Sequence, residues 1–380
     1  MKKLLPEVCT IQYGFPFDSA KFSDSEGVPL IRIRDVVRGY SETFTTEEYK
    51  DEFLVHESDL LVGMDGEFNI AKWGKTPALL NQRVCRLAPN DSIDKDYLFY
   101  FMPVALKRIE EKTPFVTVKH LSAKELNKIE IPVLPLEEQR KIAETLSKVD
   151  ELIAFREQQL AKLDELVKAR FVEMFGDPIN NPMKWIVSKI EDIAAQEKNA
   201  LKAGPFGSAL KKEFYVKSGY KIYGQEQVIC GDASFGDYYI DEEKYKELKN
   251  CAVQAGDILI SLVGTYGKAL IMPDNYEAGI INPRLMKITL NKNKVTPIYF
   301  KYYFESNALK ASMDANTHGG TMGILNLGII RQMKIQVPPL SLQNQFAAFV
   351  ERVDQQKQTV QQSLDKLELM KKALMQEYFG

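Results

Sequence analysis

The sequence predicts a mixed α/β fold built from two similar globular domains, each followed by a long coiled-coil helix. The first observation is an internal repeat: residues 131–176 and 335–380 align without a gap at an offset of 204. Because each copy must form the same structural unit, the repeat fixes the architecture. The second is a heptad pattern of apolar residues in each copy. The third is a set of weaker matches upstream, such as Asn81-Gln82-Arg83 with Asn282-Pro283-Arg284.

The repeat divides the chain into four segments. We expect a first globular domain at 1–134, a central helical spacer at 135–176, a second globular domain at 177–338 and a C-terminal helical spacer at 339–380. Residues 177–185, rich in proline and asparagine, are typical of a linker that opens the second half.

Each predicted helix begins after a proline, Pro135 or Pro339, and ends at Phe-Gly, where glycine suits a helix stop. Apolar residues spaced alternately by three and four define a coiled-coil seam. The predicted helix–helix interface consists of Leu146, Val149, Ile153, Leu160, Leu163, Val167, Val350, Val353, Val360, Leu364, Leu367 and Leu374.

Basic residues interrupt both seams. They are Arg156, Arg170, Lys357 and Lys371. A polar seam position lowers stability but fixes register and partner. A second apolar stripe in the first helix (Leu152, Phe155, Leu166, Ala169) is more than one partner helix needs. It indicates either core packing between the two helices alone or an additional docked subunit.

The globular segments have mixed secondary structure. Residues 28–37 alternate apolar and charged, which predicts a half-buried strand. Residues 59–63 and 257–263 predict buried strands that run into glycines. Residues 97–112 and 298–312 predict helices.

Composition narrows the function classes. The chain has 380 residues and a net charge of −2, so it lacks the overall basic charge of a free-standing DNA binder. No apolar run is long enough to span a membrane, and the N-terminus does not resemble a secretory signal. The four cysteines are scattered and far from the three histidines. We therefore predict no metal site, no cofactor, no membrane partner and a reducing cytoplasmic setting.

Several stretches carry a family resemblance. They are PLEEQRKIAETLSKVDELI, KARFVEMFGDP, DLLVGMDGEFNIAKW, DILISLVGTYG and GTMGILNLGII. With the duplicated order of domain then helix, the chain resembles the specificity subunit of a type I restriction–modification system over essentially its whole length. The resemblance implies two target recognition domains, each reading one half of a split double-stranded DNA site. It also implies two antiparallel helices that set the gap and dock two methyltransferase subunits, which methylate adenine N6. Restriction subunits join that complex.

The resemblance also implies that the subunit performs no chemistry itself. Methyltransferases that act on adenine carry an Asn-Pro-Pro-Tyr-like motif, whereas the one Pro-Pro pair here, Pro338-Pro339, precedes Leu340. The sequence has no GxGxxG and no GxxxxGK[ST] motif, and no catalytic residues are predicted. This pattern favours a binding subunit over an enzyme.

Candidate DNA-contacting residues are donors and acceptors suited to base edges and phosphates. In the first domain we expect Arg32, Arg34, Lys72, Lys75, Arg83, Lys119 and His120 to contact DNA. In the second we expect Tyr223, Gln225, Lys268, Arg284, His318 and Thr321.

Each candidate has a structural alternative. The arginines Arg32 and Arg34 share one face of the predicted strand, which could equally face solvent. Lys72 and Lys75 fit a charged turn, and a lone histidine is more often structural. Arg83 and Arg284 follow an asparagine at equivalent positions, so a phosphate contact or a structural hydrogen bond suits them better than base reading.

Two other readings of the whole chain stay open. One is an orphan specificity subunit that only recombines with others, although both halves are intact. The other is a scaffold that binds no DNA, with two globular domains on a coiled-coil arm. The absence of net positive charge supports the scaffold.

Overall fold

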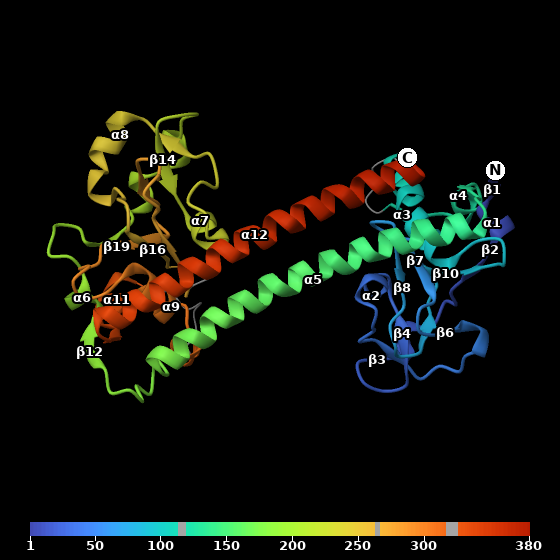
Figure 1. Ribbon diagram of the computed structural model, residues 1–380, viewed down its shortest axis with the longest axis horizontal. Helices are drawn as coiled ribbons and strands as arrows, with labels where there is room; N and C mark the ends of the chain where they lie inside the picture. Colours follow the sequence, from blue (N-terminus) through green and yellow to red (C-terminus); the bar gives the residue numbers. More distant parts are fainter. Residues whose placement is uncertain (113–118, 263–266, 317–325) are drawn as a thin grey trace. The chain divides into compact units, whose positions relative to one another are not determined.

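The computed structural model describes residues 1–112, 119–262, 267–316 and 326–380. They form two compact units: unit 1 comprises Met1–Glu157 and Gln361–Gly380, and unit 2 comprises Gln158–Val360. Each unit contains one globular domain and part of both long helices, α5 (Leu136–Phe175) and α12 (Leu340–Phe379), drawn green and red in Figure 1. The predicted mixed fold, with two similar domains and two long helices, is confirmed. The division into four segments remains a prediction.

The described part of unit 1 contains a four-stranded sheet, a five-stranded sheet and the antiparallel pair β1-β11. Its strands are β1 (Lys2–Leu4), β2 (Cys9–Tyr13), β3 (Phe22–Ser23), β4 (Val28–Ile31), β5 (Phe44–Thr45), β6 (Leu54–Val55), β7 (Leu60–Gly63), β8 (Asn69–Lys72), β9 (Ala78–Leu80), β10 (Val84–Pro89) and β11 (Glu130–Pro132). Its short and medium helices are α1 (Leu5–Val8), α2 (Ile33–Arg38), α3 (Lys95–Lys112) and α4 (Ala123–Leu126). The sheet orders are β2-β10-β7-β8 and β3-β5-β4-β9-β6, with β4 and β9 parallel.

Unit 2 repeats this plan. Its strands are β12 (Ile186–Lys189), β13 (Leu201–Ala203), β14 (Tyr220–Tyr223), β15 (Tyr239–Ile240), β16 (Ile258–Ser261), β17 (Ala269–Ile271), β18 (Gly279–Ile281), β19 (Leu285–Ile288) and β20 (Lys334–Val337). Its helices are α6 (Ile190–Ile193), α7 (Gln225–Cys230), α8 (Glu242–Glu247), α9 (Pro297–Phe304), α10 (Asn307–Asn316) and α11 (Leu327–Gln332). The order β13-β19-β16-β17 matches the first sheet of unit 1, and β14 and β18 form the parallel pair.

A carboxylate at the start of the central strand is paired with a cation in both units. In unit 1 Arg86 Nη1 lies 3.1 Å from Asp59 Oδ2. In unit 2 Lys287 Nζ lies 2.9 Å from Asp257 Oδ2, and both side chains are buried. Both units therefore pair the carboxylate, although the cation differs; in unit 2, where both charges are buried, each charge needs the other as a partner.

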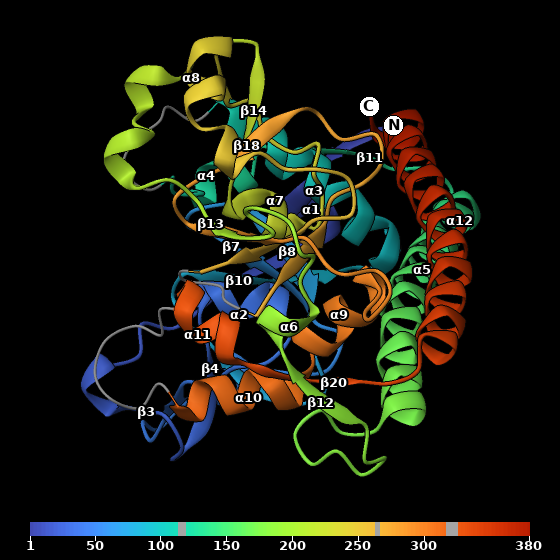
Figure 2. The same cartoon turned by 90° about the vertical axis from the view of Figure 1, so that its left-hand side faces the viewer.

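The two long helices are antiparallel within each unit. In unit 1 Lys371 Nζ lies 2.6 Å from Asp150 Oδ1, and Arg156 Nε donates to Ser363 Oγ at 3.2 Å. In unit 2 Lys357 Nζ lies 2.6 Å from Asp164 Oδ1. The basic seam residues therefore reach the facing helix, and Figures 1 and 2 show the helices side by side.

The residues predicted for the helix–helix interface are buried or half-buried. The buried ones are Leu146, Val149, Val167, Val350, Val353 and Leu364. The half-buried ones are Ile153, Leu160, Leu163, Val360, Leu367 and Leu374. Their role in holding the helices together remains a prediction.

The C-terminal end of each long helix packs into a globular domain through phenylalanine. In unit 1 the ring of Phe379 lies 5.3 Å from that of Tyr97. In unit 2 the ring of Phe175 lies 4.8 Å from that of Tyr299. Gly176, which follows the first helix, has a φ of +78°, a left-handed conformation that glycine adopts without strain.

Two sequence-based expectations for secondary structure were wrong. Residues 28–37 are not one strand: β4 ends at Ile31 and α2 begins at Ile33, because Asp35 accepts the Arg32 N–H at 2.9 Å and caps the helix. Residues 298–312 are two helices. The break falls between α9 and α10, where Glu305 Oε1 accepts the Ala269 N–H at 2.9 Å and Ser306 Oγ accepts the Leu309 N–H at 3.3 Å.

Among the described residues, no helix combines the length and apolar character needed to cross a membrane.

Candidate nucleic-acid interface

Polar side chains gather where the two parallel strands of each unit end. In unit 1, β4 leads into Arg32 and β9 leads into Asn81-Gln82-Arg83. Parallel strands present their carboxyl ends at one edge of a sheet, which is where ligands bind in many α/β proteins. We call this group of residues, together with Asp65 and His120, the edge site of unit 1.

Asp65 organises the basic residues of this edge site. Its two carboxylate oxygens lie 3.4 Å from Arg83 Nε and 2.5 Å from His120 Nδ1. Arg83 Nη1 and His120 Nδ1 are 3.5 Å apart. About half of each basic side chain is exposed, so the carboxylate holds both groups in place while they remain available to a ligand.

Arg32 and Arg34 are exposed at the start of α2, not on one strand face as expected. Asp35 is buried, and its Oδ1 lies 3.7 Å from Arg34 Nε. This buried carboxylate therefore fixes the first turn of α2, from which the two guanidinium groups can reach outward.

The edge site of unit 2 occupies the same place with different chemistry. It comprises Gln225, Glu226, Ser261, Asn282 and Arg284. Gln225 Nε2 donates to Ser261 Oγ at 2.8 Å, and Arg284 Nη1 donates to Gln225 Oε1 at 3.4 Å. Gln225 and Glu226 form the first turn of α7.

The backbone around the two edge sites is the same. Met64 N–H donates to Arg83 O at 3.0 Å, and Leu262 N–H donates to Arg284 O at 2.9 Å. Gly14 and Gly204 pack against the Asn81 and Asn282 carbonyls so closely that a Cβ at either position would clash. The two units thus present different side chains on one shared frame.

Other residues predicted to contact DNA in the first domain lie away from the edge site or pair elsewhere. Lys72 Nζ lies 2.9 Å from Asp96 Oδ1 and 5.1 Å from the Phe99 ring centroid. Lys119 Nζ donates to Glu110 O at 3.1 Å, which turns it toward α3. Lys75 is exposed in the turn between β8 and β9.

In the second domain the remaining candidates divide into three cases. Tyr223 is fully buried, and its hydroxyl donates to Glu277 O at 2.6 Å, so its side chain cannot reach DNA without a rearrangement of the domain. Burial and nearby Glu277 raise the pKa of Tyr223. Lys268 is exposed and lines a pocket of about 370 Å³ beside α9 and α10. His318 and Thr321 lie outside the described residues.

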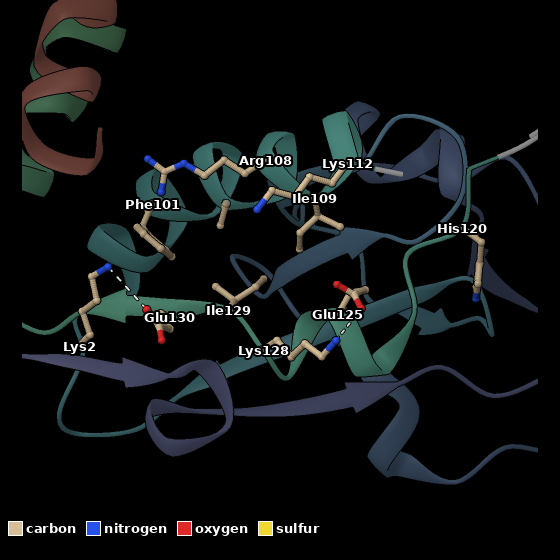
Figure 3. A pocket seen from close by; sticks show the side chains of 11 residues that line it. Lys2, Phe101, Arg108, Ile109, Lys112, His120, Glu125, Lys128, Ile129 and Glu130 are labelled. Carbon is tan, nitrogen blue, oxygen red and sulfur yellow. Dashed lines mark hydrogen bonds and ion pairs between the residues drawn. The ribbon is translucent and has the colours of Figure 1, made fainter. Parts of the chain in front are cut away.

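A second basic feature of unit 1 is a pocket of about 660 Å³ beneath the C-terminal half of α3 (Figure 3). Its basic lining residues are Lys2, Arg108, Lys112 and Lys128, with His120 at one end. Lys2 and Lys128 pair with Glu130 and Glu125 at 3.6 and 3.1 Å. Lysine and arginine side chains outnumber carboxylates two to one here, which suits an anionic ligand such as a phosphate.

Sequence reasoning missed Asp65, Ser261 and the basic pocket. Asp65 lay in a loop recognised only for its glycines, and Ser261 at the end of a buried strand. The repeated Asn-x-Arg triplet was the one signal that marked both edges. The lining of the pocket comes from segments more than a hundred residues apart, so no local pattern reveals it.

Comparison with known proteins gives the same picture. Residues 1–165 and 182–369 match the family model of the type I restriction modification DNA specificity domain. The chain is 28% identical to the type I restriction enzyme EcoBI specificity subunit of Escherichia coli, covering 92% of this chain and 78% of that one. It is 22% identical to the MjaVIII specificity subunit of Methanocaldococcus jannaschii, covering 91% and 87%.

Solved structures share the fold. The S subunit of a type I restriction–modification system from M. genitalium superposes with a TM-score of 0.56 at 16% identity, covering 100% of this chain and 96% of that one. A chain from a structure of type I R-M complex assembly and conformational transition gives 0.62 at 15% identity, covering 100% and 97%. The two matched segments span most of the sequence and coincide with its two repeated halves, and the chain therefore belongs to the type I restriction–modification DNA specificity family.

Proposed function

We propose that this chain is the DNA-specificity subunit of a type I restriction–modification complex and that each globular domain reads one half of a bipartite DNA site. The observation that carries the proposal is the pair of edge sites, which share a backbone frame but differ in side chains. Two copies of one sequence reader need identical residues, whereas two readers of different half-sites need a common frame with different residues. This chain has the second arrangement.

The chemistry of the two edges suits different bases. Arginine pairs through two hydrogen bonds with guanine O6 and N7, glutamine with adenine N6 and N7, and glutamate accepts from cytosine N4. Unit 1 offers Arg32 and Arg34, and unit 2 offers Gln225 and Glu226. We infer that the half-site of unit 1 contains a guanine contact and that of unit 2 an adenine or cytosine contact.

Arg83 and Arg284 take a different role in this proposal. Their carbonyls accept the same backbone hydrogen bond in each unit, and their side chains are kept in both copies. A contact that positions DNA without reading its sequence must be the same in both halves. We assign these two arginines to phosphates.

The long helices set the spacing between the two DNA half-sites and provide the surface to which partner subunits bind. Each runs unbroken for 40 residues through parts of both units. With the seam residues as heptad positions a and d, four successive c and g positions on one exposed side of the C-terminal part of each helix carry like residues in both copies: Lys162 and Lys366, Leu166 and Met370, Ala169 and Ala373, Glu173 and Glu377. The outward positions are mixed: Glu165 and Leu369 differ, whereas Lys168 and Lys372 are alike. Like residues on an exposed side support two copies of one partner, which we take to be methyltransferase subunits that modify adenine N6, joined by restriction subunits.

In this proposal the chain is a non-catalytic subunit, and the complex acts on DNA in the cytoplasm. The test is the methylome of a host that expresses the chain with the methyltransferase encoded beside it. We expect a two-part motif with N6-methyladenine in each half, lost when the chain is omitted. Methylation that persists without the chain, or none with a competent partner, would favour the scaffold that binds no DNA.

Two variants assign the half-sites. Arg32→Ala should relax one half of the motif only, and Gln225→Ala should relax the other half only. Lys107→Ala, an exposed charge on α3, is the matched control and should leave both halves unchanged. A single variant that changes both halves would contradict the assignment of one half to each domain.

A further inference from the structure

The surfaces that the helices offer to partners are unequal in the two units. In unit 1 three large apolar side chains lie on heptad positions c and g of the helix pair: Leu152, Phe155 and Met370, exposed by 45%, 52% and 42%. The equivalent positions in unit 2 are Gln356, Thr359 and Leu166. All three are exposed, but only Leu166, at 48%, is apolar.

The three apolar side chains of unit 1 lie on one side of the helix pair. Asp150 faces Lys371 across the seam, so Leu152 and Met370 are level with one another on adjacent helices. Both occupy the g position, and in an antiparallel pair the g positions of the two helices flank the same edge of the seam. Phe155 follows Leu152 by three residues and shares its face.

Two other apolar residues of the helix pair in unit 2 bear on this comparison. Val172 is 54% exposed, but it occupies the outward position f and not position c or g. Phe349 stands at the position equivalent to Thr145. It is only half-exposed, packs against the core of unit 2, and lies 5.9 Å from the guanidinium carbon of Arg170. Phe349 therefore stabilises the unit and does not restore the missing exposed apolar surface.

We propose that the two methyltransferase subunits bind with unequal affinity, the tighter at the Leu152–Phe155–Met370 face of unit 1 and the weaker at the Gln356–Thr359–Leu166 face of unit 2. This inference rests on the proposed function. The occupant follows from the like residues that continue each face: a lysine, an alanine and a glutamate recur in both copies, as one repeated partner requires. A partner shaped for Leu152 and Phe155 loses apolar contact when it meets Gln356 and Thr359 instead.

Burial of two half-exposed large apolar side chains is enough to separate the two affinities by at least about tenfold. The complex should therefore assemble in order, with a stable species of one methyltransferase per chain at intermediate concentration. If each half-site needs its own methyltransferase subunit, that species should methylate DNA poorly.

The experiment exchanges the residues between the two faces. Purified methyltransferase is titrated into the full chain, and the one- and two-subunit complexes are counted by native mass spectrometry. The wild-type chain should bind the first subunit at least about tenfold more tightly than the second. Leu152→Gln with Phe155→Thr should remove the tight site and leave two weak, equal sites. Gln356→Leu with Thr359→Phe should make both sites tight.

Glu151→Gln is the matched control, because it also imports the residue of the other copy (Gln355) but at an outward position. It should leave both affinities unchanged. Two equal sites in the wild-type chain, or a tight site that survives Leu152→Gln with Phe155→Thr, would overturn the inference and leave the proposed function intact. Absence of any methyltransferase binding would overturn both. Self-association of the chain that the same double variant abolishes would assign the face to a second copy and also overturn it.

Discussion

Gln139 and Gln343 make the same three hydrogen bonds in their own units. The Gln139 side chain accepts from Asp94 N–H at 2.8 Å and donates to the Ser92 and Leu134 carbonyls at 3.2 and 2.7 Å. Gln343 accepts from Thr296 N–H at 2.8 Å and donates to the Lys294 and Pro338 carbonyls at 3.0 and 2.8 Å. Both amides are fully buried. Each side chain links the first turn of a long helix to the loop that precedes α3 in unit 1 or α9 in unit 2.

Replacement of either glutamine should destabilise its own unit. Gln139→Ala and Gln343→Ala each leave a buried N–H and two carbonyls without the side-chain amide, which should lower the free energy of unfolding by about 2–3 kcal/mol. Thermal unfolding followed by circular dichroism measures the effect. Gln345→Ala, an exposed amide on α12, is the control and should be neutral. Equal melting curves for Gln343→Ala and Gln345→Ala would contradict the fastening role.

A buried lysine in unit 2 makes its stability sensitive to acid. Lys221 is 1% exposed and donates to Glu277 Oε1 at 2.8 Å and to Ser234 O at 2.7 Å. The hydrogen bond from Lys221 lowers the pKa of Glu277 below its ordinary value of 4.5. A carboxyl with a lowered pKa contributes stability above its unfolded pKa and loses it as the pH falls through the folded pKa. The contribution is thus complete at pH 6 and declines below about pH 4.5.

Glu277→Gln should remove that part of the pH dependence. The variant should melt at a lower temperature than the wild type at pH 6, and the difference should shrink between pH 4.5 and pH 3. Melting temperatures across this range measure it, with Glu243→Gln, an exposed carboxylate on α8, as the control. A difference that stays constant down to pH 3 would show that Glu277 does not carry the acid sensitivity.

At the scale of elements, the sequence is most informative where a pattern is long and local. The heptads predicted α5 and α12 because each seam repeats over many turns, so a single basic interruption such as Arg156 does not hide it. The prediction of one strand over residues 28–37 was wrong because alternation of apolar and charged residues over so short a segment also fits a strand followed by a capped helix. The helix cap depends on Asp35, whose carboxylate accepts the Arg32 N–H. A search for alternating apolar and charged residues does not detect such a cap.

Leu163 tests the seam of the helix pair. It is half-buried and packs against the core of unit 2. Leu163→Asp places a carboxylate there and should lower the free energy of unfolding by at least about 2 kcal/mol and disrupt assembly with the methyltransferase. Leu166→Asp, three residues on and 48% exposed, should impair assembly without changing the melting temperature. Full assembly by the Leu163→Asp variant would mean that the seam is wrong.

At the scale of the whole molecule, the repeat reveals the two units but not their edge sites. Asn81 and Asn282 mark equivalent strand ends, and this much is visible in the sequence. Their neighbours are not: Asp65 and His120 meet through an isolated bridge between segments 55 residues apart. Under the proposed function, base-reading residues differ between the two halves, so the repeat is least informative at the positions that would set specificity. Tyr223 is an example: tyrosine is a residue type that suits DNA contact, but the side chain is buried and the hydroxyl donates to Glu277 O.

The long helices should act as a ruler for the gap between the two half-sites. Insertion of one heptad after Ala161 and one after Val360, which lie level across the antiparallel pair, keeps the seam in register and lengthens both helices. Seven residues add roughly 10 Å, so the gap in the methylated motif should grow by up to about three base pairs while both half-sites stay the same. Methylome sequencing reads the gap directly. A seven-residue glycine–serine insertion after Asn180, in the exposed linker, is the control and should leave the gap unchanged. If the heptad insertions also left it unchanged while methylation persisted, the spacing would have to be set by the partner subunits instead of by α5 and α12.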